Sequence, residues 1–74
     1  MDASMRRVYL ARVRDFVEGV TFPATRREVL AYAQRKNTPS DIIGDLDHLK
    51  ADRFASLNDV VAAVDELHFG AAAR

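Results

Sequence analysis

Three short stretches of this sequence combine a hydroxyl side chain with an acidic residue three positions later, a pattern that begins many α-helices. They are Thr25-Arg26-Arg27-Glu28, Thr38-Pro39-Ser40-Asp41 and Ser56-Leu57-Asn58-Asp59. In such a capping box the hydroxyl accepts a hydrogen bond from the first helical turn, and the acid accepts one from the amide of the capping residue. The stretches therefore predict three helix starts within a chain of 74 residues.

Apolar residues recur at spacings of three and four behind each start and also over residues 4–19, and this periodicity is typical of amphipathic helices. The sequence therefore predicts an all-α, compact four-helix domain. We expect its helices at approximately residues 4–19, 26–36, 39–50 and 57–69. Gly19, Asn37 and Gly70 are suitable residues at which helices end.

The first predicted helix carries its apolar residues in one stripe, which we expect to face the core. The stripe consists of Met5, Tyr9, Val13, Phe16, Val17 and Val20. Gly44 lies inside the third predicted helix, where glycine costs about 1 kcal/mol relative to alanine. It therefore predicts a close contact between helices.

Short extended segments are expected before the second and fourth helices. Pro23 disfavours helical geometry in the residue before it, and Phe22 and Phe54 occupy similar places ahead of helix starts. The two segments could pair as very short strands, with both phenyl rings in the core. The elements together predict a single small helical domain over residues 1–74, with residues 71–74 as a loose tail.

The chain has no cysteine, so neither a disulfide bond nor a thiolate zinc site can support its core. A chain of this size buries only about 60% of its unfolded surface, which predicts marginal stability. The sequence begins without the apolar run of a signal peptide, and its longest apolar run, residues 60–64, is too short to span a bilayer. We therefore expect a cytoplasmic protein with no membrane partner.

The net charge is zero, but the charges are divided unevenly along the chain. Residues 1–37 contain eight Lys or Arg and four acids, whereas residues 38–74 contain three Lys or Arg and seven acids. The simplest interpretation is that the two halves attract each other, and a basic binding surface is the alternative. The expected contacts of an anion or nucleic acid are Arg6, Arg7, Arg14, Arg26 and Arg27.

Arg26 and Arg27 open the second predicted helix, where free amides and the helix dipole attract anions. Thr25 and Glu28 already occupy this helix start, however, which favours an ordinary solvated surface. Residues 26–50 also resemble a helix-turn-helix, but the aspartates of its second helix would repel a polyanion. Nucleic-acid binding is therefore expected only as contact with the backbone.

Four residues of the third predicted helix could hold a divalent ion, and they fall at steps of four, three and four along one flank. They are Asp41, Asp45, His48 and Asp52. No facing cluster accompanies them, so a polar flank is the preferred interpretation, and we expect no metal and no cofactor. Neither His48 nor His68 lies in a nucleophile or acid–base signature, so we expect no catalytic residue and no enzyme activity.

Residues 22–64 contain a Phe22-Pro23-Ala24-Thr25 start, a leucine-rich third helix and a Phe54-x-Ser56-x-x-Asp59-Val60 ending. With these features the segment resembles a small bacterial domain family that is catalogued only as a domain of unknown function. The resemblance leaves the first helix outside. It implies a fold, and it implies no activity, cofactor or site residue.

These observations favour an uncharacterised small non-enzymatic protein-interaction module that is open to self-association. Its partner would be another protein or a second copy of the chain. The alternative is a weak, sequence-nonspecific nucleic-acid-binding protein that uses arginines of the first two helices. The first helix decides between monomer and module: if its stripe packs fully on the other helices, no apolar surface is left for a partner.

Overall fold

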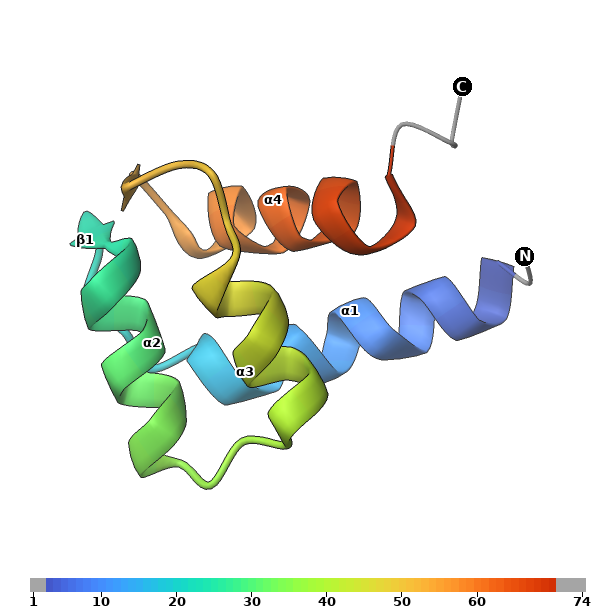
Figure 1. Cartoon of the computed structure of the whole chain (residues 1–74), viewed down its shortest axis with the longest axis horizontal. Helices are drawn as coiled ribbons and strands as arrows, with labels where there is room; N and C mark the ends of the chain where they lie inside the picture. The colour runs from blue at the N-terminus through green and yellow to red at the C-terminus, as the bar shows by residue number, and fades with distance from the viewer. Residues whose placement is uncertain (1–2, 71–74) are drawn as a thin grey trace.

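Four helices make up most of the computed structural model, which describes residues 3–70 (Figure 1). They are α1 (Ala3–Val17), α2 (Arg26–Arg35), α3 (Ser40–Asp47) and α4 (Leu57–Phe69). α1 and α4 lie side by side and run in opposite directions, with α2 and α3 packed across them. The four predicted helices are thus confirmed, while the predicted tail at residues 71–74 lies outside the described part of the chain.

The capping box predicted at Thr25 is confirmed at the start of α2. The Thr25 hydroxyl accepts a hydrogen bond of 3.1 Å from the Glu28 amide, and the Glu28 carboxylate accepts one of 2.8 Å from the Thr25 amide. Ser56 likewise caps α4 by accepting a 3.3 Å bond from the Asp59 amide. The Asp59 carboxylate instead accepts from the amide of Ala55, one residue before the cap. Local chemistry therefore sets both helix starts.

The third predicted start is wrong in detail. Pro39, not Thr38, is the residue before α3, and proline offers no side-chain cap. The Thr38 hydroxyl instead donates a 2.7 Å hydrogen bond to the Ala33 carbonyl, near the end of α2. Thr38 therefore serves the end of the preceding helix, beside Asn37, whose positive φ of 57° confirms the predicted left-handed terminator.

α3 ends at Asp47, three residues before the predicted end, because the chain must turn there to reach a strand. The Arg26 amide donates a 2.7 Å hydrogen bond to the Asp52 carbonyl, which holds residues 48–52 away from a helical path. Leu49 continues the helical apolar spacing and is buried, but it reaches the core from a turn. Tertiary pairing has overridden local periodicity here.

The two extended segments form a minimal sheet, so the molecule is mostly α-helical and the predicted purely all-α class is corrected. β1 (Ala24–Thr25) pairs antiparallel with β2 (Arg53–Phe54), with Ala24 opposite Phe54. Phe54 is buried in the core, and Phe22 packs against it from a partly buried position. The predicted pairing of the two Phe-containing segments is confirmed.

The core lies between α1, α2, α3 and α4. Its largest fully buried side chains are Val13, Val17, Val29, Ile42, Leu46, Val60 and Val64. Gly70 follows α4 with a φ of 68°, which confirms it as a helix terminator. Gly44 does not mark a close helix contact: a Cβ there would meet no described atom within 4 Å. That prediction is wrong, since Gly44 faces open space.

Candidate functional site

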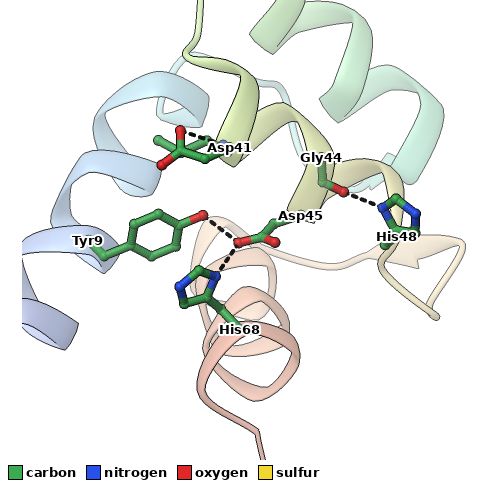
Figure 2. Close-up of polar contacts among 7 residues, drawn as sticks. Tyr9, Asp41, Gly44, Asp45, His48 and His68 are labelled. Carbon is green, nitrogen blue, oxygen red and sulfur yellow. Dashed lines mark hydrogen bonds and ion pairs between the residues drawn. The ribbon is translucent and has the colours of Figure 1, made fainter. Parts of the chain in front are cut away.

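A polar cluster of Tyr9, Asp45 and His68 joins α1, α3 and α4 at the edge of the core (Figure 2). The Tyr9 hydroxyl donates a hydrogen bond to Oδ2 of Asp45, and Nδ1 of His68 lies 2.9 Å from the same oxygen. The Tyr9 and His68 rings are stacked, with centroids 4.4 Å apart and planes inclined by 22°. Phe69 packs edge-on against both rings. Asp45 is thus the acceptor that ties the three helices together.

The surroundings of Tyr9 determine what its phenol can do. Burial, helped by the hydrogen bond to Asp45 and the negative charges of Asp45 and Asp41, raises the pKa of Tyr9 well above its usual value, and Arg12 only partly opposes this. A phenol that keeps its proton at neutral pH is a hydrogen-bond donor and neither a nucleophile nor a base. The hydrogen bond of this hydroxyl to Asp45 gives Tyr9 a structural role, because it joins α1 to α3.

The four possible metal ligands predicted for one flank of the third helix do not all lie on it, because Asp52 falls beyond the end of α3. The Asp41 carboxylate accepts a 2.9 Å bond from the Ile42 amide, while Asp45 is engaged with Tyr9. Nδ1 of His48 lies 2.6 Å from the Gly44 carbonyl, and Asp52 lies beyond the end of α3. Across residues 3–70, no three His, Asp or Glu side chains converge as metal ligands would.

Arg6, one of the five arginines predicted to contact an anion, is held by an aspartate of α4. Its Nε and Nη2 lie 2.8 and 2.5 Å from the two carboxylate oxygens of Asp65, a bidentate pair. Hydrogen bonding to Asp65, with its negative charge, raises the pKa of Arg6 further. The Arg6 guanidinium also lies 5.9 Å from the centre of the Phe69 ring. Arg6 thus joins the two oppositely charged halves of the chain.

Arg26 points toward the segment between α3 and β2. Its Nη1 donates a 2.8 Å hydrogen bond to the Asp47 carbonyl, and its Nη2 lies 3.6 Å from the Asp52 carboxylate. Its Nε is buried without a hydrogen-bond partner among the described residues. The other three predicted contacts, Arg7, Arg14 and Arg27, are exposed. The structure therefore places two of the five arginines in internal contacts and leaves three at the surface, where anion contact stays a prediction.

The apolar stripe of α1 is mostly buried, but one member is not. Tyr9, Val13 and Val17 reach the core, whereas Met5, predicted to join them, is 63% exposed. Val8, one turn along the helix, is 55% exposed. Helical geometry places Met5 and Val8 together with the exposed Arg12 and Asp15 within an arc of about 80°. We call these four residues the α1 strip.

A groove on the other side of α4 was not predicted from the sequence. It has a volume of about 470 Å³ and lies between α4 and the segment that follows α3. Its lining, which we call the α4 groove, consists of Leu49, Lys50, Ala51, Ala63, Glu66 and Leu67. Leu67 was expected among the apolar residues of the fourth helix, yet 38% of it is exposed here. Only the turn after Asp47 brings Leu49 opposite α4, so helical spacing alone could not have revealed the groove.

None of the helices within residues 3–70 has the length and apolar character needed to cross a membrane. No curated protein and no solved structure matches the chain. A family model does match, over residues 10–61. The match begins inside α1, so the expectation that the first helix lies wholly outside the family is wrong. The chain belongs to the family described as a protein of unknown function (DUF2795).

Proposed function

We propose that this chain is a small non-enzymatic protein-interaction module that docks through the α1 strip. The observation that supports this function is the exposure of Met5 and Val8 on one face of α1. Two large apolar side chains one turn apart present a surface that gains free energy when a partner covers it. Because the rest of the α1 stripe packs on the core, the docking surface is small, which favours a weak and reversible contact.

The polar cluster supports the non-enzymatic part of the proposal. Tyr9, Asp45 and His68 resemble a catalytic constellation in composition, but the Tyr9 hydroxyl is already engaged as a donor to Asp45, and burial raises its pKa and so favours the protonated phenol. The two hydrogen bonds to Asp45 and the stacked rings instead join three helices. The cluster thus supports a rigid scaffold for α1.

The function can be tested by affinity capture with matched variants. The tagged chain, a Met5→Ser/Val8→Ser variant and an Ala11→Ser control are immobilised and exposed to the same cell extract. Ala11 is exposed on α1 but lies outside the strip, so its substitution should leave binding intact. We expect at least one protein to be retained by the wild type and the control and lost by the strip variant. Identical retained proteins on all three would refute the proposal.

Nucleic-acid binding is the alternative, and the exposed Arg7, Arg14 and Arg27 are the residues that it would use. Labelled duplex and single-stranded DNA can be titrated at low and moderate salt. Phosphate contacts release counterions, so binding by this mechanism weakens steeply with salt. Salt-sensitive binding that is lost in an Arg7→Gln/Arg14→Gln/Arg27→Gln variant would favour the alternative, and no binding at low salt would exclude it.

A further inference from the structure

We propose that the occupant of the α4 groove is the α1 strip of a second copy, so that copies of the chain join through two different surfaces. This inference rests on the proposed docking role of the strip. It adds the identity of the partner and the surface that receives it.

The groove has the composition needed to receive apolar side chains. Leu49, Ala51, Ala63 and Leu67 contribute its apolar lining, and the volume of about 470 Å³ leaves room for more than one side chain. Small residues on both sides, Ala51 and Ala63, keep the groove open between the two leucines. Met5 is a suitable occupant because its flexible thioether adapts to irregular apolar surfaces.

The charges of the two surfaces are complementary. The strip carries one cation, Arg12, and one anion, Asp15, beside its apolar pair, and the groove carries Lys50 and Glu66 beside its apolar lining. The ion pairs found within the described residues involve none of these four groups. Docking therefore offers two new pairings, of Arg12 with Glu66 and of Asp15 with Lys50. Such pairs fix orientation more than they add affinity.

The α1 helix of the same chain cannot fill this groove. It packs on the face of α4 that carries Asp65 and His68, as the contacts with Arg6 and Tyr9 establish. Ala63, Glu66 and Leu67, at helical spacings of three and four, form a different face of α4. A strip that is to occupy the groove must therefore come from another molecule.

A contact between two different surfaces has a consequence that a symmetric contact lacks. When strip and groove are distinct, a copy without a functional strip still offers a groove, and a copy without a groove still offers a strip. Two variants that each fail to self-associate should therefore associate with each other. Pairing of α1 with α1 across a twofold axis would not show this behaviour.

Sedimentation equilibrium on the purified chain tests the proposal, over concentrations from micromolar to millimolar. The strip variant is Met5→Ser/Val8→Ser and the groove variant is Glu66→Arg/Leu67→Ser. Each alone should associate at least about tenfold more weakly than the wild type, the scale expected for losing a central contact. An equimolar mixture with one variant fluorescently labelled should restore association, with the labelled species reaching the mass of two chains and no more.

Single charge reversals provide a second measurement that does not disturb the core. Arg12 and Glu66 are both exposed, so Arg12→Glu and Glu66→Arg should keep the native circular dichroism spectrum. Each should weaken self-association several-fold at low salt, and mixing the two should restore it.

Three outcomes would overturn the inference. A constant mass of 8.3 kDa for the wild type at every concentration would exclude self-association altogether. If the groove variant self-associated as strongly as the wild type, the groove would be excluded as the receiving surface. The same would follow if the mixture of the two variants associated no more strongly than either variant alone. In each case a protein captured from the extract only by chains with an intact strip would preserve the proposed function. Failure of the inferred self-association can therefore be distinguished from failure of the proposed function.

Discussion

Gly19 lies against the hydroxyl end of the Tyr32 ring, so closely that a Cβ at residue 19 would fall 2.8 Å from Tyr32 Cζ and closer still to the phenolic oxygen. A methyl group at residue 19 would therefore force the Tyr32 ring, which approaches from α2, to shift. The atoms that a Cβ would meet belong to the outer end of a half-buried side chain, so the ring can swing aside at the cost of part of its packing.

We expect Gly19→Ala to destabilise the fold by up to about 1 kcal/mol, the low end of the cost of overpacking, because the Tyr32 ring gives up part of its packing to make room. The free energy of unfolding can be measured by urea denaturation followed by circular dichroism. A Gly19→Ala/Tyr32→Ala double variant should lose less than the sum of the two single changes, because the clash is gone. Full additivity would contradict the contact.

Gly44→Ala is the matched comparison, and we expect it to raise the free energy of unfolding where Gly19→Ala lowers it. Gly44 lies inside α3, and a Cβ there meets open space among the described residues. Alanine should therefore stabilise the protein by about 0.5–1 kcal/mol, the difference in helix propensity. A loss of stability in this variant would reveal a packing role for Gly44 that the structure does not contain.

The helix caps of α2 and α4 provide a prediction about local chemistry. Thr25→Ala and Ser56→Ala should each lower the free energy of unfolding by about 1 kcal/mol, because an amide in the first turn loses its acceptor. Thr21→Ala, at an exposed residue before β1, is the control and should change stability little. Denaturation midpoints equal to that of the wild type for both cap variants would mean that the caps contribute nothing.

The raised pKa of Tyr9 predicts how the free energy of unfolding changes at alkaline pH. Its pKa is raised in the folded protein, first by burial and then by Asp45, so the folded state holds this proton more tightly than the unfolded chain does. The contribution of this pKa difference to the free energy of unfolding is therefore fully present below the unfolded pKa of about 10 and is lost as the pH rises above that value. Stability measured by urea denaturation should fall from about pH 10 upward.

Tyr9→Phe removes the titrating group and should flatten this part of the pH profile while costing about 1 kcal/mol at neutral pH through the lost hydrogen bond. Tyr32→Phe is the control, since it removes a phenol outside the polar cluster. An alkaline profile of Tyr9→Phe identical to the wild-type profile would show that Tyr9 does not govern it.

The helix starts at Thr25 and Ser56 could be predicted from the sequence because each capping hydroxyl accepts a hydrogen bond from a backbone amide only three residues away. The end of α3 could not, since it depends on the Arg26 amide reaching the carbonyl of Asp52. Gly44 and Gly19 show the same difference between a local feature, which the sequence reveals, and a tertiary contact, which it does not. A glycine inside a helix is conspicuous in a sequence, yet the close contact occurs at Gly19, where a residue of another helix arrives.

The polar cluster was also beyond sequence reasoning. Tyr9 was predicted as a core residue and Asp45 as part of a polar flank, and each description is correct as far as it goes. That they bond each other across 36 positions, with His68 against the same oxygen, follows only from the packing of α1 and α4 on α3. A lone histidine near a helix end carries no signal of such a partner.

The bidentate pair between Arg6 and Asp65 predicts a small, salt-dependent coupling between α1 and α4. Both side chains are partly exposed, at 42% and 24%, so solvent screens much of the attraction. A double-mutant cycle with Arg6→Met and Asp65→Asn should give a coupling energy of about 0.5–1 kcal/mol at low salt and less at high salt. Arg7→Met with Asp65→Asn is the control cycle, because Arg7 is exposed on another face of α1. Equal coupling in the two cycles would mean that general charge attraction between the halves, and not this pair, holds α1 against α4.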